Sequence, residues 1–114
     1  MPVIYKICPA PLWRDAERDG VFAGAPVDTA DGFIHFSTAS QVVETAAKHF
    51  AGARDLLLVR VDAEKLGDRL KWEVSRGGAL FPHLYGPLRL ADVDKVEPLP
   101  LDGDGRHVFP PLEP

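Results

Sequence analysis

The feature that most constrains the fold of this chain is an apolar run from Leu56 to Val61, which only Arg60 interrupts. Short runs of leucine and valine without helical spacing predict a β-strand. Because the run does not alternate with polar residues, it is typical of a strand that is buried on both faces. We therefore expect this strand at the centre of a sheet.

The other predicted elements form an early group that contains the helices and a late group dominated by strands. Early in the chain we expect a strand at 3–8, a helix at about 11–18, a loop at 24–32, a strand at 33–37 and a helix at about 38–50. Later we expect strands at 69–75 and about 88–96, separated by an irregular loop at 81–87. The lack of a regular βαβ alternation favours an α+β fold, with a mixed or antiparallel sheet flanked by helices.

Hydrophobic spacing indicates which side chains enter the core. In the helix at 38–50, apolar residues recur at helical spacing, and in the strand at 69–75 they alternate with polar ones. The expected core residues are Ile4, Val42, Val43, Ala46, Phe50, Leu56, Leu58 and Trp72.

Length and composition predict a single domain, 1–114, with a globular body at 1–100 and a tail at 101–114 rich in proline and glycine. Hydrophobic residues make up 46% of the chain, which is enough for an ordinary core. Cys8 is the only cysteine, and the N-terminal residues lack the pattern of a signal peptide. We therefore expect a cytoplasmic protein.

Charge and hydropathy argue against two classes of partner. The formal net charge is -4 and the 13 Lys and Arg residues are scattered, whereas a nucleic-acid surface needs clustered ones. The longest apolar run is too short to cross a bilayer. We expect neither a nucleic-acid nor a membrane partner, and the sequence leaves protein partners unknown.

The segment Asp31-Gly32-Phe33-Ile34-His35-Phe36-Ser37 is the first candidate for a functional site. On a strand, His35 and Ser37 share one face, opposite the two apolar side chains. They then point to a cleft or to solvent near the N-terminus of the next helix, where an anionic group binds well. A structural explanation is also open, in which Ser37 helps to cap the helix and His35 bonds a buried carbonyl.

The segment Phe81-Pro82-His83-Leu84-Tyr85-Gly86-Pro87 is the second candidate. Two prolines and a glycine restrict its backbone, and rigid loops that present polar aromatic side chains are typical of binding clefts. Glu73 adds the carboxylate that a cluster of His35, His83 and Tyr85 lacks. Its alternative role is a solvated charge that pairs with Lys71 or an arginine.

From these segments we expect one site with two groups of residues. The catalytic candidates are His35, Glu73 and Tyr85, and the ligand-binding candidates are Gly32, Ser37, Phe81 and His83. The spacing of the histidines and Glu73 matches no zinc motif, so we expect no metal.

With D-G-F-I-H-F-S at 31–37, L-K-W-E at 70–73 and F-P-H-L-Y-G-P-L at 81–88, the chain resembles domain-of-unknown-function family 952, a group of small bacterial proteins. The resemblance extends from Ile4 to about Val96. It implies an architecture similar to that of the ADP-ribosyltransferases, whose split, mostly antiparallel sheet holds NAD in a cleft. It also implies that His35 holds the ribose or the carboxamide, Tyr85 stacks on the nicotinamide, and Glu73 stabilises an oxocarbenium-like centre.

Two function classes follow from the sequence. One is an enzyme that binds a small polar or nucleotide-like molecule and transfers ADP-ribose from NAD, so that NAD is a substrate. The other is a non-catalytic ligand-binding or interaction module on the same fold. Glu73 within reach of His35 and Tyr85 would favour the enzyme, whereas Glu73 in bulk solvent or locked in a salt bridge would favour the module.

Overall fold

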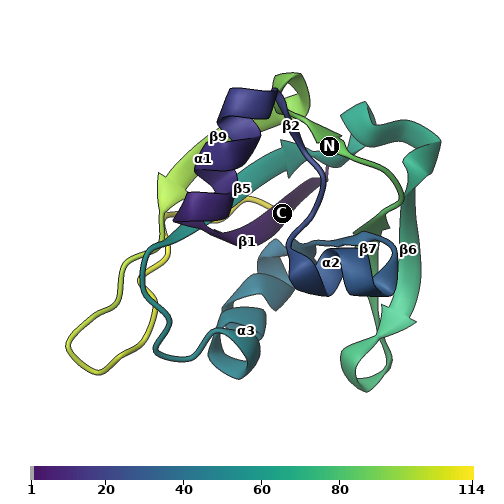
Figure 1. Ribbon diagram of the computed structural model, residues 1–114. Coiled ribbons are helices and arrows are strands. Elements are labelled where there is room, and N and C mark those ends of the chain that lie inside the picture. Colours follow the sequence, from purple (N-terminus) through teal and green to yellow (C-terminus); the bar gives the residue numbers. More distant parts are fainter. Residues whose placement is uncertain (1) are drawn as a thin grey trace.

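A computed structural model describes residues 2–114, which form a single α+β domain with three small antiparallel sheets (Figure 1). The largest sheet has the strand order β4-β1-β5-β9, formed by Ser37–Thr38, Val3–Pro9, Leu56–Asp62 and Val93–Pro98. The second has the order β3-β7-β6, formed by Ile34–His35, Ala79–Leu84 and Leu70–Ser75. The third pairs β2, Val21–Phe22, with β8, Leu88–Arg89. The expected split, antiparallel arrangement is therefore confirmed.

In the part of the chain that the structure describes, three α-helices and three short 3₁₀ helices connect and cover these sheets. The α-helices are α1, α2 and α3, at Ala10–Asp19, Pro26–Asp31 and Ala39–His49. The 3₁₀ helices are η1, η2 and η3, at Ala63–Arg69, Arg76–Gly78 and Leu90–Asp92. None of the helices in residues 2–114 has the length and hydropathy to span a membrane.

Strand β5 lies between β1 and β9, as its apolar run predicts. On one side of the sheet, Val59 and Val61 pack in a core cluster with Trp13 of α1. On the other side, Leu58 packs with Val42 of α3. Both faces of the strand are therefore buried, which explains why its sequence does not alternate.

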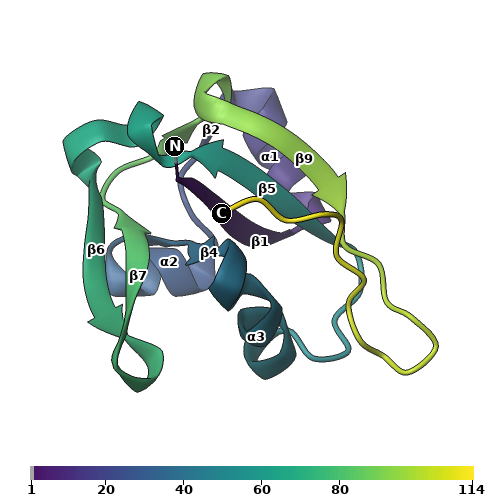
Figure 2. The same ribbon diagram turned by 180° about the vertical axis from the view of Figure 1, so that it is seen from behind.

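The C-terminal tail closes the second of these clusters as an ordered strap (Figure 2). Leu99 is buried in the cluster, and Phe109 and Leu112 pack against it. The hydroxyl of Tyr5 on β1 accepts a hydrogen bond of 2.8 Å from the backbone N–H of Glu113. The proline-rich tail is thus part of the fold.

Two expected core residues are exposed. Val43 is 51% exposed because α3 turns Thr45, next to Val42 and Ala46, toward the sheet. Trp72 is 42% exposed because β6 directs the face that carries Glu73 inward. Both elements have the predicted secondary structure. The buried face of the helix is rotated relative to the prediction, and that of the strand is reversed.

Four segment boundaries also differ from the sequence prediction. The strand region expected at about 88–96 is divided by η3, so that β8 and β9 belong to different sheets. The loop expected at 24–32 contains α2, because Pro26 is well suited to the first position of a helix. The N–H of Ala25, just before the helix, donates a hydrogen bond of 2.8 Å to Asp28 Oδ2. The strand expected at 33–37 is divided between β3 and β4, which belong to different sheets. The loop expected at 81–87 is a strand, β7, as far as Leu84.

Pro82 fits within β7 because its nitrogen is not needed between β7 and β6. Its carbonyl accepts a hydrogen bond from the N–H of Phe36, so the backbone polar atoms of Pro82 point toward the β3 side. Strand β3 has already ended at His35 on that side. The missing N–H therefore interrupts no β6–β7 hydrogen bond.

Candidate functional site

The strand register of the three-stranded sheet, β3-β7-β6, brings the two predicted motifs together. His35 on β3 is the direct cross-strand partner of His83 on β7, and their ring centroids lie 5.5 Å apart. Glu73 on β6 lies opposite Phe81, which places its side chain on the same face as His83. Residues that are far apart in sequence thus form one continuous group.

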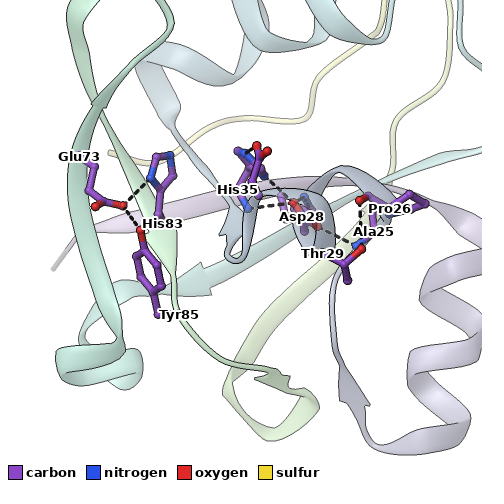
Figure 3. A network of polar contacts seen from close by, with 10 residues as sticks. Ala25, Pro26, Asp28, Thr29, His35, Glu73, His83 and Tyr85 are labelled. Carbon is purple, nitrogen blue, oxygen red and sulfur yellow. Dashed lines mark hydrogen bonds and ion pairs between the residues drawn. The ribbon is translucent and has the colours of Figure 1, made fainter.

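Glu73, His83 and Tyr85 make a hydrogen-bonded group centred on one carboxylate oxygen (Figure 3). The hydroxyl of Tyr85 donates to Glu73 Oε1 at 2.7 Å, and His83 Nδ1 lies 2.8 Å from the same atom. The hydrogen bonds from Tyr85 and then His83 lower the pKa of Glu73, while the bond to Glu73 raises the pKa of Tyr85. Because Glu73 is ionised, His83 must carry its proton on Nδ1, and Nε2 of a neutral ring is then an acceptor.

Phe33 links this group to His35. Its ring stacks on His83 with centroids 4.0 Å apart and also contacts the rings of His35 and Tyr85, at 4.6 and 5.3 Å. Phe33 and His35 are half-buried, His83 is buried and Tyr85 is exposed at the rim. The result is an aromatic surface with a carboxylate at one end.

Asp28 on α2 is the centre of a second polar group, on the other side of His35 (Figure 3). It is 1% exposed and lies 2.9 Å from the ammonium group of Lys6, which is also buried. Asp28 Oδ1 contacts Nδ1 of His35 at 2.7 Å and accepts from the backbone N–H of His35 at 3.1 Å. Burial alone would raise the pKa of Asp28, but the bond to His35 and the charge of Lys6 hold that pKa at about 2.

The second ring nitrogen of His35 faces another carboxylate. Its Nε2 lies 2.9 Å from Oδ2 of Asp31, the last residue of α2, which is half exposed. Both contacts of the ring are hydrogen bonds only when both nitrogens carry a hydrogen. Since Asp28 is buried and Asp31 is exposed, the Asp31 contact is the one that a ligand can replace.

His35 and Ser37 line a cavity of about 290 Å³ between α2 and α3. Lys6, Thr45 and His49 add polar groups to the wall of the same cavity. Ser37 Oγ lies 3.1 Å from Thr45 Oγ1, so Ser37 is bound to the side of α3 rather than to its N-terminal N–H groups.

Gly32 and Phe81 line neighbouring hollows. Gly32 ends α2 with a φ of 85°, a left-handed conformation that favours glycine, and borders a hollow of about 390 Å³ together with Asp28 and Phe33. Phe81 is buried and borders a smaller space next to Thr45 and His49. The other six predicted site residues therefore lie around His35 on several sides, and the seven do not line one cavity.

Sequence reasoning missed Asp28, Lys6 and Phe33, and treated His49 as incidental. Pro26 followed by an acidic residue two positions later was the available signal for Asp28, since both are typical of a first helical turn. Lys6 gave no signal beyond its apolar neighbours. Within residues 2–114, no group of three or more His, Cys, Asp or Glu side chains is placed to hold a metal ion.

The arrangement provides two imidazole–carboxylate pairs that lie side by side, Asp28–His35 and Glu73–His83. A carboxylate that holds one ring nitrogen fixes the tautomer and strengthens the other nitrogen as a base. The side chain of Glu73 is 39% exposed, and its Oε1 contacts His83 and Tyr85. Its second oxygen, Oε2, is also a hydrogen-bond acceptor.

Comparisons with known proteins identify one matching family and a similar protein of known structure. A family model described as "Protein of unknown function (DUF952)" matches residues 7–96. The crystal structure of protein CC0527 from Caulobacter crescentus is 52% identical, with a TM-score of 0.89 over 93% of each chain. The solution NMR structure of CC0527 is 53% identical, with a TM-score of 0.84 over 93% of this chain and 91% of that one. No curated protein matches. On this evidence the chain belongs to the DUF952 family, whose function is unknown.

Proposed function

We propose that the two imidazole–carboxylate pairs form a binding site for a small polar or nucleotide-like molecule, and that the site transfers ADP-ribose from NAD. The observation that carries the proposal is the ionised Glu73, held at one oxygen by Tyr85 and His83 beside the rings of Phe33 and His35. Such a group combines surface for stacking, hydrogen-bonding capacity and a negative charge.

Each part of NAD has a complementary partner in this arrangement. The exposed ring of Tyr85 offers a face on which a nicotinamide stacks. His35 can bond a ribose hydroxyl or the carboxamide once Asp31 moves aside. Oε2 of Glu73 accepts from a second hydroxyl, and its charge stabilises the oxocarbenium-like centre that forms as nicotinamide leaves.

The first test is a thermal-shift screen with NAD, ADP-ribose and free nucleotides, followed by measurement of nicotinamide release. We expect NAD to raise the melting temperature of the wild type, because a ligand that binds only the folded state stabilises it. His35→Ala should weaken this shift, since alanine offers no hydrogen bond.

Glu73→Gln separates catalysis from binding. It keeps the shape of the side chain and removes the charge, so it should spare the thermal shift and lower release on the order of 100-fold. Glu17→Gln, an exposed carboxylate on α1, is the matched control and should change neither quantity.

Two results would change the assignment. If the wild type neither binds NAD at millimolar concentration nor releases nicotinamide with any acceptor tested, the transferase proposal is rejected. If NAD or a nucleotide binds and Glu73→Gln leaves every rate unchanged, the chain is a ligand-binding module on this fold.

A further inference from the structure

Strand β6 forms an open edge of the small sheet, and its backbone groups are available there. Within residues 2–114 the sheet has the order β3-β7-β6, so β6 pairs with β7 on one side alone. Figure 2 shows this strand at the outer side of the molecule. An unpaired strand edge is a template for another strand.

The phase of the β6–β7 ladder shows which residues face the open edge. The N–H of Tyr85 donates to the carbonyl of Arg69 at 2.8 Å, and these two residues follow the same antiparallel register as the rest of the pair. Since such hydrogen bonds alternate along a strand, the N–H and C=O groups of Leu70, Trp72 and Val74 point away from β7.

Two of these residues, Trp72 and Val74, put exposed apolar side chains on one face of the sheet, whereas Leu70 packs against the core. Trp72 and Val74 are 42% and 70% exposed, and Leu80 on β7, opposite Val74, is 53% exposed. Grouped exposed apolar side chains of this size are typical of interaction surfaces. The open backbone edge and the apolar face therefore coincide.

We propose that β6 pairs antiparallel with β6 of a second copy of the chain, about a two-fold axis at Trp72. In this register Leu70 lies opposite the partner's Val74, and Trp72 lies opposite the partner's Trp72. Val74 likewise lies opposite the partner's Leu70. These three residue pairs form their hydrogen bonds through the backbone groups that point away from β7. An interface of this type is self-complementary, as a two-fold axis requires.

Charge selects this register over its neighbours. With the axis at Trp72, Lys71 lies opposite the partner's Glu73, and Glu73 lies opposite the partner's Lys71. Shifting the axis to Lys71 puts two lysines in contact, and shifting it to Glu73 puts two carboxylates in contact. Opposite charges that face each other across strands stabilise the pair, and like charges destabilise it.

The pairing also has a consequence for the candidate site. Glu73 uses Oε1 for Tyr85 and His83, and the partner's Lys71 would reach the same carboxylate from the edge. The proposal itself rests on the strand edge and its charges, and it stands whether or not the site transfers ADP-ribose.

Sedimentation and mass measurements on charge variants test the pairing. The wild type is expected to be a dimer at roughly 100 µM, where even a micromolar dissociation constant gives nearly complete association. Lys71→Glu and Glu73→Lys each create two like-charge contacts and should weaken association about tenfold or more. An equimolar mixture of the two variants restores both opposite-charge pairs and should recover the dimer mass. Lys65→Glu on η1 is the matched control and should behave as the wild type.

Cysteine substitutions along β6 test the register and do not depend on the charge variants. Under mild oxidation Trp72→Cys should give a disulfide-linked dimer, because residues opposite each other on the axis are about 5.5 Å apart at Cα. Lys71→Cys and Glu73→Cys should crosslink at most a tenth as well, and Cys8 is buried. A monomeric wild type at roughly 100 µM, a Lys71→Glu variant that associates as the wild type does, or a mixture that stays monomeric would each overturn the proposal. A heterologous strand that binds β6 more tightly than the second copy does would assign the edge to that partner instead.

Discussion

At the scale of single residues, Asp28 is the group on which the polar interior depends. It accepts from the backbone of α2 and β3 and from the side chains of Lys6 and His35. A buried carboxylate is tolerated only when such partners compensate for lost hydration. Lys6→Ala would leave Asp28 with His35 and the backbone donors but without its buried opposite charge, and urea unfolding should show a loss of roughly 3–5 kcal/mol.

The lowered pKa of Asp28 predicts how stability depends on pH. Folding lowers this pKa from 3.8 to about 2, so the folded state binds the proton less tightly than the unfolded state. The stabilisation is complete above the unfolded pKa and is lost as pH falls from about 5 through 2, by roughly 2 kcal/mol. Urea unfolding at several pH values should show the difference between wild type and Asp28→Asn shrinking over this window.

Asp19→Asn is the control for this measurement, because Asp19 is exposed at the end of α1. The change between pH 5 and 2 should be larger for Asp28→Asn than for Asp19→Asn, because only Asp28 is buried beside Lys6 and His35. An Asp28→Asn difference that changes no more than the Asp19→Asn difference would show that Asp28 keeps an ordinary pKa in the folded state.

Part of this residue-level picture could be predicted from the sequence. His35, Glu73, His83 and Tyr85 stood out because their chemistry is unusual for strands and tight segments, and the structure brings them together. Asp28 and Lys6 did not stand out, because an aspartate near a proline resembles a turn and a lysine in a strand resembles a solvated position. Only the packing of α2 against β1 reveals their ion pair.

At the scale of the elements, the apolar run of β5 determines the centre of the largest sheet. Leu58 of β5 is buried against α3. Leu58→Ala should therefore lower the free energy of unfolding by roughly 2–5 kcal/mol through the cavity it leaves. Val43→Ala on the exposed side of α3 is the comparison and should change it by no more than about 0.5 kcal/mol. Equal effects of the two substitutions in urea titrations would mean that the core is misplaced.

Element boundaries and faces were harder to predict than element types. The alternation at 70–75 correctly predicted a strand, but it could not show that the face with Glu73 packs inward. That outcome depends on Phe33 and His83, which offer β6 a half-polar surface to cover. Pro82 similarly suggested a loop. The sequence does not show that β3 stops pairing with β7 at His83, so that the missing N–H of Pro82 interrupts no bond within that strand pair.

At the scale of the whole molecule, the acidic charge limits the choice of partners. The net charge is -4, and we expect the chain not to bind DNA or RNA tightly at physiological salt. An electrophoretic mobility assay with random oligonucleotides should show no retardation at submicromolar protein. Retardation that disappears with added salt would instead reveal a basic surface created by folding or assembly.

The proposed function requires that the group around His35 and His83 binds a ligand, and the imidazole signals of the protein report on such binding. In a ¹H–¹⁵N spectrum tuned to histidine rings, NAD at millimolar concentration should shift the signals of His35 and His83. It should leave His107 unchanged, because that ring lies in the C-terminal strap, where its Nε2 contacts the backbone carbonyl of Ala53. If NAD leaves His35 and His83 unmoved, or moves His107 as much as either, the account is contradicted.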